Sequence, residues 1–246
     1  MKVIADGCGC FPSGRHYPGI AHLLRVTVRG LAEEFPQDTP WEEMSIALLD
    51  VETTGKDSGA DRVVEVGIAV GRGGQVIARY NWLVNPGQPI GAEAQAVHGI
   101  SDADVKDSPR FEAIAHEIAN ALEACVPAAY NAAFDRAFLH AEFGRARAEN
   151  PKAPALRREV DWLDPLVWAR DLQSDERSRS LGDVAARLGV ALENAHRASD
   201  DAEAALRVFF KLAEDPRVPR GYGALVQEQR RLSLSQADER RMWRKF

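Results

Sequence analysis

The order of apolar segments along the chain is the feature that most restricts its fold. Three strand candidates follow one another directly, at residues 46–52, 62–70 and 75–84. Glycines at positions 71, 73 and 74 favour a hairpin turn between the last two. Beyond them, segments with helical and strand-like spacing alternate. Consecutive strands followed by alternation predict an α/β fold in which helices flank a mixed β-sheet, built from a meander and then crossover units.

The later segments are mostly helical. Apolar spacing predicts helices at 110–124, 133–148, 165–173, 180–188, 199–214 and 222–236, and short strands at 126–130 and 160–163. Before the first strand, residues 19–35 have the spacing of an amphipathic helix. We therefore expect an N-terminal extension at 1–44, a main domain at 45–214, and a helical, basic C-terminal extension at 215–246.

Composition and charge exclude several classes of protein. Of 246 residues, 45% are hydrophobic and 28% charged, as in soluble globular proteins. No apolar run approaches the ~20 residues that span a bilayer, and Asp6 interrupts any signal-like stretch. We therefore expect a cytoplasmic protein with no membrane partner. The formal net charge of −6 argues against coating of nucleic acid by bulk electrostatics. The basic residues within 230–246 are interpreted as a solvated tail helix in preference to a phosphate-binding arm.

Three cysteines are too few for a disulfide framework. Cys125 lies in an apolar stretch, where a buried thiol is expected. Cys8 and Cys10, with His16 and His22, offer zinc ligands, but their spacing matches no finger pattern. A loop is therefore the favoured interpretation of this segment.

Two acidic residues end the first strand. Asp50 and Glu52 are two positions apart, so their side chains project from the same face of a strand. Two neighbouring carboxylates repel each other unless a cation neutralises them, and a divalent metal ion is the simplest such cation. On its own, this pair is more typical of solvated acids at a strand end than of a metal site.

Two further acids stand near helix starts. Asp135 follows the strand at 126–130, and Asp201 lies five residues after His196. Positions five apart differ by about 140° around a helix, so His196 is expected on the loop before the helix and Asp201 inside it. Asp200, followed by Glu203, resembles a helix-start signal and is expected to cap the helix.

Together these segments resemble a known family. Asp-x-Glu-Thr-Thr-Gly at 50–55, Asn-x-x-Phe-Asp at 131–135 and His-x-Ala-x-x-Asp at 196–201 stand in the order of the three exonuclease motifs of the DEDD superfamily. The match is to its histidine-containing, DnaQ-like branch, to which the proofreading subunit of bacterial DNA polymerase III belongs. Val97-His98-Gly99-Ile100 also matches, and the resemblance covers about 45–212. Tyr130 departs from the histidine that many relatives have there.

The resemblance implies a ribonuclease-H-like fold and a metal-dependent 3′→5′ exonuclease. It assigns His196 as general base and four acids as ligands of two Mg²⁺ or Mn²⁺ ions: Asp50, Glu52, Asp135 and Asp201. It assigns substrate contacts to Thr53, Val97, His98, Asn131 and Phe134. The chemistry agrees, because two divalent ions ~3.5–4 Å apart stabilise both the attacking and the leaving oxygen of a phosphodiester. Oxygen ligands favour Mg²⁺ or Mn²⁺ over zinc.

The expected substrates are single-stranded 3′ ends of DNA or RNA. One alternative is an RNA-trimming enzyme resembling ribonuclease T or oligoribonuclease. Another is a polymerase-associated proofreading or binding subunit. Because all five motif residues are present, a purely non-catalytic module ranks lower. The segment after residue 214 is short for a polymerase-binding extension, which favours a stand-alone exonuclease over association with a DNA polymerase.

Overall fold

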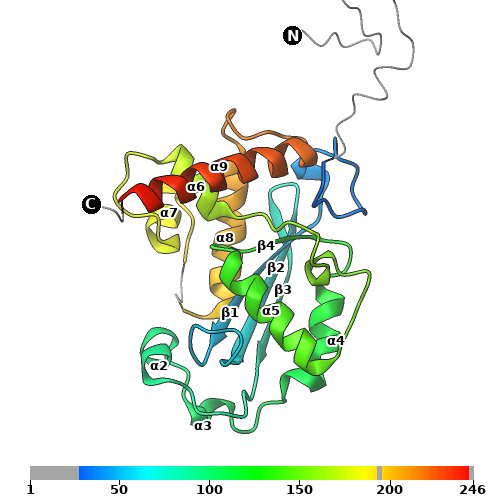
Figure 1. Cartoon of the computed structure of the whole chain (residues 1–246), viewed down its shortest axis with the longest axis vertical. Helices are drawn as coiled ribbons and strands as arrows, with labels where there is room; N and C mark the ends of the chain where they lie inside the picture. The colour runs from blue at the N-terminus through cyan, green and yellow to red at the C-terminus, as the bar shows by residue number, and fades with distance from the viewer. Residues whose placement is uncertain (1–27, 193–195, 244–246) are drawn as a thin grey trace, which may run out of the picture.

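A mixed four-stranded sheet forms the centre of the protein in a computed structural model that describes residues 28–192 and 196–243 (Figure 1). Its strands are β1 (Ile46–Thr53), β2 (Val63–Arg72), β3 (Gln75–Leu83) and β4 (Val126–Ala128), in the order β3-β2-β1-β4. β1, β2 and β3 form an antiparallel meander, and β4 pairs parallel to β1. The predicted hairpin, meander and crossover are confirmed.

Helices cover both faces of this sheet. α4 (Phe111–Ala121) and α5 (Ala133–Ala146) pack on one face, and α8 (Ala198–Ala213) packs on the other (Figure 1). Successive side chains of β1 point to opposite faces of the sheet. Ala47 and Leu49 pack in the α4/α5 core, and Ile46 and Leu48 pack in the α8 core. Asp50 and Glu52 continue the second series, so they lie on the α8 face at the end of β1.

The remaining elements pack around these layers. They are η1 (Trp41–Glu43), α2 (Ala92–His98), α3 (Asp102–Val105), η2 (Pro154–Leu156), α6 (Pro165–Leu172), α7 (Leu181–Leu188) and α9 (Tyr222–Trp243). α2 and α3 were not predicted. α2 has seven residues and is capped after His98 by Gly99, whose φ of 72° is left-handed and suits glycine. Helices this short carry little periodic signal.

Two expectations about secondary structure are wrong. Residues 28–35 form turns, not the end of a helix, and Gly30 adopts a φ of 82° there. A glycine at positive φ breaks helical geometry. The rest of the expected helix, with Cys8, Cys10, His16 and His22, lies outside the described residues. The expected strand at 160–163 is reduced to an isolated bridge between Leu163 and Ala128.

The segments on either side of the main domain contribute to the same core. Ala32, Trp41 and Met44 are buried in the α8 core, and α9 adds Tyr222 and Leu225. The backbone N–H of Ala32 donates to the Tyr222 hydroxyl at 2.9 Å, which ties the two ends of the described chain together. These contacts explain why α9 runs across the top of the molecule beside residues 28–44 (Figure 1).

The basic charges of α9 are largely compensated. Arg230 pairs with Asp161, and α9 also holds the pairs Arg231–Glu228 and Arg241–Asp238. This pairing agrees with the interpretation of a solvated tail helix. Within the described part of the chain, no helix is both long and apolar enough to cross a bilayer.

Candidate active site

The carboxyl end of β1 provides the first two acids. Asp50 pairs with Gly67 of β2, and Glu52 pairs with Glu65. Val51, between them, points into the opposite core and is 5% exposed. This alternation places both acidic side chains on the α8 face, as their spacing predicts.

The turn before α5 fixes the third acid. Asn131 has a φ of 72°, and the Asp164 carboxylate accepts the backbone N–H groups of Asn131 and Ala132 at 3.0 and 3.1 Å. Asp135 follows in the first turn of α5 and is 4% exposed. Its Oδ1 accepts the N–H of Val51 at 3.1 Å, which joins α5 directly to β1 beside Asp50.

The start of α8 holds the histidine and the fourth acid. His196 lies on the loop before the helix with a φ of 69°, and Asp201 lies inside the helix, as predicted. The backbone N–H of His196 donates to Asp201 Oδ2 at 2.8 Å. The expectation that Asp200 caps the helix is wrong. α8 begins at Ala198 after Arg197, and the Asp200 side chain instead pairs with Arg79 at 2.5 Å.

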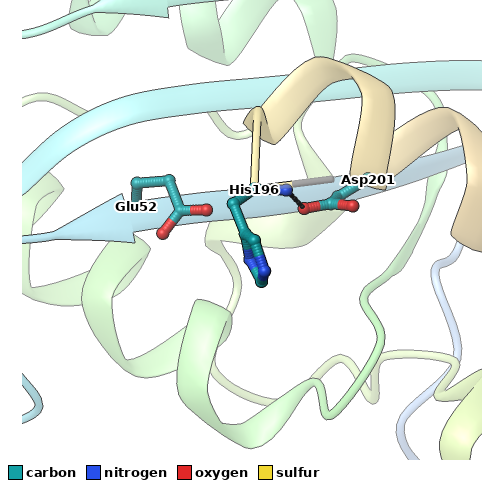
Figure 2. Close-up of side chains that lie close together, drawn as sticks. All are labelled: Glu52, His196 and Asp201. Carbon is teal, nitrogen blue, oxygen red and sulfur yellow. Dashed lines mark hydrogen bonds between the residues drawn. The ribbon is translucent and has the colours of Figure 1, made fainter. Parts of the chain in front are cut away.

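These elements converge on one cavity. Side-chain ligand atoms of Glu52, His196 and Asp201 all lie within 4.8 Å of one another, and His196 lies between the two acids (Figure 2). Asp50 and Asp135 line the same cavity of about 470 Å³ but fall outside that close triplet. The structure thus brings together the five residues that the motifs predicted. Three of them have their ligand atoms within 4.8 Å of one another.

The electrostatics of the cavity are unfavourable for four ionised acids. Burial, the neighbouring Asp201 and then Glu65 raise the pKa of Asp50 to about 8. Burial, Asp50, Asp201 and Glu65 raise the pKa of Glu52 to about 8, and Arg197 opposes this. Burial and Asp50 raise the pKa of Asp135 well above its ordinary value. Burial also raises the pKa of Asp201, against the hydrogen bond from His196. Each carboxyl therefore gains from a cation placed among them.

The donor chemistry fits a hard divalent cation. The cluster offers carboxylate oxygens and one imidazole, and carboxylates are the ligands that Mg²⁺ and Mn²⁺ prefer. A bound cation would favour the ionised form of each of these carboxyls. A purely structural set of acids would instead be balanced by arginine or lysine, whereas only Arg197 lowers the pKa of Glu52 here.

A second, larger cavity adjoins the first. It measures about 1010 Å³ and shares Val97 and Phe134 with the acidic cavity. Thr53 and His98 line the second cavity alone, and Asn131 lines the first alone. The predicted substrate contacts therefore surround two connected spaces beside the acids.

The two ring nitrogens of His98 are engaged with the backbone. Nδ1 accepts the N–H of Ile100 at 3.1 Å, so the protonated Nε2 faces the carbonyl of Thr53 at 3.2 Å. Burial lowers the pKa of His98, which favours this neutral form. The two ring nitrogens thereby join the end of α2 to β1.

Sequence reasoning missed two residues beside the site. Glu65 is 0% exposed in β2, and its carboxylate accepts from the guanidinium of Arg197. The available signal was the single charged residue within the otherwise apolar run VVEVGIAV at 63–70. A charge in such a run is expensive to bury unless it is paired, so it indicates a specific partner.

Comparison with protein families identifies the chain. A family model for exonucleases, of the RNase T type, matches residues 48–209. The chain belongs to this exonuclease family. The match contains every motif residue of the acidic cavity and confirms the DnaQ-like resemblance. The exonuclease domain is accordingly a nuclease, a hydrolase of phosphodiester bonds.

Its curated relatives include much longer proteins. DNA polymerase III PolC-type of Streptococcus suis is 29% identical over 213 residues, covering 83% of this chain and 14% of the relative. The protein of the same name from Streptococcus pneumoniae strain D39 is 33% identical over 168 residues, covering 68% of this chain and 11% of the relative. The exonuclease chain thus corresponds to a small part of each.

Solved structures share the fold. Exonuclease X in complex with 5′ overhanging duplex DNA has a TM-score of 0.55 at 23% identity and covers 71% of this chain and 95% of that chain. Escherichia coli exonuclease I in complex with a dT13 oligonucleotide has a TM-score of 0.60 at 19% identity and covers 71% of this chain and 42% of that chain. These likenesses confirm the predicted ribonuclease-H-like fold.

Proposed function

We propose that this exonuclease removes mononucleotides from single-stranded 3′ ends of DNA. The observation that carries the proposal is the convergence of Glu52, His196 and Asp201 to within 4.8 Å in a cavity that Asp50 and Asp135 also line. Phosphodiester hydrolysis needs a base for the attacking water and positive charge for the phosphate and the leaving oxygen. The cavity offers an exposed imidazole for the first and a set of cation ligands for the second.

His196 is the proposed general base. Its side chain is exposed at the cavity and its backbone is fixed by Asp201, so the ring meets solvent from a defined position. In the reaction, the water oxygen bonds to phosphorus and its proton passes to the imidazole of His196. The bond between phosphorus and the 3′ oxygen of the preceding nucleotide breaks. The leaving oxygen takes a proton from solvent, and a 5′-mononucleotide is released.

Asp50, Glu52, Asp135 and Asp201 are the proposed ligands of two Mg²⁺ or Mn²⁺ ions. Such ions supply the positive charge that balances the carboxylates and the charge developing on the phosphate. Burial raises the pKa of all four acids, and a bound divalent cation would oppose that shift, which is consistent with the proposal. The hydrogen bonds to Asp135 from Val51 and to Asp201 from His196 hold two of the carboxylates in place.

The larger cavity is the proposed site of the terminal nucleotides. Phe134 and the 58% exposed Val97 stand where the two cavities meet, so bases in the larger cavity would pack on them while the scissile phosphate reaches the acids. Aromatic and apolar surfaces suit bases without selecting a sequence. Thr53, His98 and Asn131 complete the proposed contacts.

The relatives' names support DNA as the substrate and a DNA polymerase as a working partner. A matched pair of single-stranded DNA and RNA oligonucleotides, labelled at the 5′ end, would test substrate and direction with Mn²⁺ or with chelator. A ladder that shortens from the 3′ end, on DNA and only with metal, is expected. Cutting of circular single-stranded DNA, or undiminished digestion in chelator, would overturn the proposal. Faster digestion of RNA would select the RNA-trimming alternative.

A further inference from the structure

The loop that carries His196 is fastened at two points. On one side, the His196 N–H bonds to Asp201. On the other, the next two residues bond to Glu65: Arg197 donates from Nε at 3.2 Å and Nη2 at 2.8 Å, and the Ala198 N–H donates at 3.1 Å. His196 thus lies next to both contacts, its own main-chain bond to Asp201 and the bonds of the following two residues to Glu65. Its left-handed φ of 69° is unfavourable for a residue with a side chain, so outside contacts must maintain it.

Glu65 is itself rigidly placed. It is fully buried in the middle strand of the meander, and Asn81 of β3 donates to its Oε1 at 2.9 Å. Two positions along the same face, Gly67 lies beneath the start of α8, where an added Cβ would come 2.1 Å from the carbonyl carbon of Ala198. The bare glycine lets the helix approach, and Glu65 then fixes its first residues to the sheet.

The location of Glu65 has an electrostatic cost. It pairs directly across the strands with another acid, Glu52. Like charges facing each other across strands are destabilising. Hydrogen bonds offset this cost, because the carboxylate accepts from the side chains of Asn81 and Arg197 and from the N–H of Ala198.

We propose that Glu65 and Arg197 are positioning residues that hold the His196 imidazole in its catalytic orientation. Neither group reaches the reacting atoms in this role. The carboxylate of Glu65 holds the guanidinium of Arg197 and the backbone N–H of Ala198, and these two contacts fix the chain that sets where the ring of His196 points. This inference rests on the proposed role of His196 as general base.

A double-mutant cycle tests the coupling. Glu65→Gln keeps the shape but replaces an acceptor oxygen with an NH₂ group that opposes the N–H donors. At saturating Mn²⁺ and DNA, we expect kcat to fall on the order of 10- to 100-fold, the usual effect of disturbing an outer contact of a catalytic group, with little change in KM. In a His196→Ala background the same substitution is expected to change kcat by no more than about twofold, since its target is gone.

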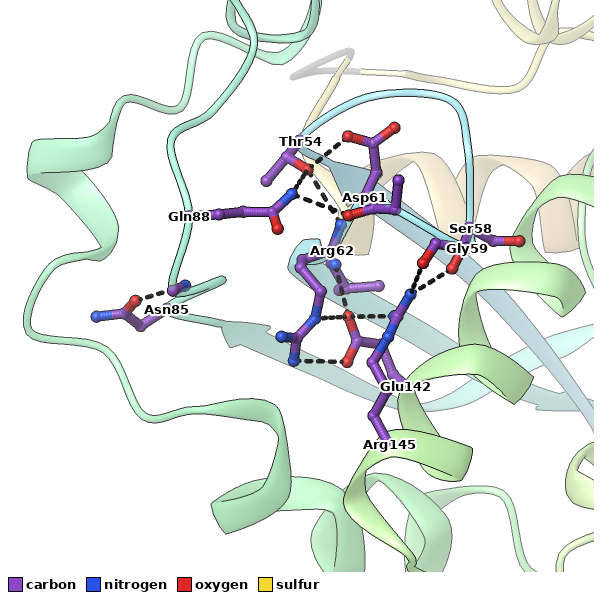
Figure 3. Close-up of polar contacts among 12 residues, drawn as sticks. Thr54, Ser58, Gly59, Asp61, Arg62, Asn85, Gln88, Glu142 and Arg145 are labelled. Carbon is purple, nitrogen blue, oxygen red and sulfur yellow. Dashed lines mark hydrogen bonds and ion pairs between the residues drawn. The ribbon is translucent and has the colours of Figure 1, made fainter.

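The chain supplies a matched control in Glu142. This 1% exposed glutamate accepts from Arg62 at 2.7 and 2.9 Å and from the N–H of the next residue, Val63, at 3.1 Å (Figure 3). The geometry repeats that of Glu65, but it fastens the loop between β1 and β2. Glu142→Gln is therefore expected to lower stability comparably, and any effect on kcat should be the same with and without His196.

The outcomes distinguish the positioning role of Glu65 and Arg197 from the role of His196 as general base. Circular dichroism and thermal melting check folding, and Arg197→Gln, at a half-exposed position, replaces Glu65→Gln in the cycle if the latter does not fold. Equal losses of kcat in both backgrounds, or none in the wild-type background, would overturn the positioning role. A wild-type rate for His196→Ala alone would instead overturn the assignment of the base.

Discussion

The backbone N–H of His196 donates a 2.8 Å hydrogen bond to Oδ2 of Asp201, five residues further along the chain. The bond joins the proposed base to a proposed metal ligand through the main chain and does not involve the imidazole. The two residues are therefore close but have separable chemistry. Substitution of one side chain can be compared directly with substitution of the other.

His196→Ala is expected to slow turnover by roughly 10²–10⁴-fold, the usual contribution of a positioned base. The four carboxylates remain, so binding of Mn²⁺ measured by calorimetry should persist. Asp201→Ala should instead lower metal affinity and turnover together. His116→Ala, at an exposed position on α4, serves as the control and should leave turnover unchanged. Loss of Mn²⁺ binding in His196→Ala would show that the imidazole is a ligand.

Without metal, the protein is expected to become less stable as the pH rises. Asp50 and Glu52 have pKa values of about 8 in the folded state, against roughly 4 for carboxyls in an unfolded chain. Between these values the folded protein retains protons that the unfolded chain releases. The free energy of unfolding therefore falls between about pH 4 and pH 8.

Melting temperature measured in chelator from pH 5 to pH 8.5 checks this slope. Asp50→Asn should flatten it and raise the melting temperature at pH 8, because a neutral amide has no charge to desolvate. Added Mg²⁺ or Mn²⁺ should raise the melting temperature most at high pH, where the carboxylates are ionised. A metal effect that is independent of pH would contradict the proposed ligand set.

Phe134→Ala is expected to weaken binding of single-stranded DNA. Phe134 stands where the acidic cavity meets the larger one, and stacking of one base on an aromatic ring contributes about 1–3 kcal/mol. KM should therefore rise by roughly 10- to 100-fold, with a smaller effect on kcat. Ile77→Ala, a 61% exposed position on β3, is the control. An unchanged KM would remove Phe134 from the proposed nucleotide site.

Local patterns predicted the sheet and the placement of the acids on it, and the family resemblance of the ordered motifs supplied the site. Alternation in β1 placed Asp50 and Glu52 on one face, and the 140° separation placed His196 outside the helix and Asp201 inside it. The cap at Asp200 was wrong because α8 begins at Ala198, which places Asp200 inside the first turn. Its carboxylate pairs there with Arg79, which is distant in sequence.

Contacts between residues that are far apart in the chain could not be predicted from the sequence. The Glu65–Arg197 contact joins residues 132 positions apart, and Ala32 reaches Tyr222 across 190 positions. No spacing rule connects such residues, because the fold alone makes them neighbours. The helix expected at 19–35 does not form within 28–35. The apolar residues there pack on the core through tertiary contacts, and Gly30 turns the chain.

Trp41→Ala is expected to destabilise the domain while sparing its chemistry. Trp41 is 5% exposed, and its ring stacks on Phe210 of α8 at 5.8 Å and meets Phe209 edge-on at 6.3 Å. Truncating a buried tryptophan to alanine costs about 3–5 kcal/mol. No motif residue lies before position 45, so turnover per folded molecule should stay near the wild-type value.

Urea unfolding gives the stability, and turnover on single-stranded DNA at low temperature gives the activity. A truncation that begins at Glu42 removes Trp41 and should reproduce both results. Leu234→Ala, at a 70% exposed position on α9, is the control and should change stability by no more than about 0.5 kcal/mol. A truncated protein that is folded but inactive would show that the segment before the main domain contributes to the reaction, because lost packing alone lowers only the folded fraction.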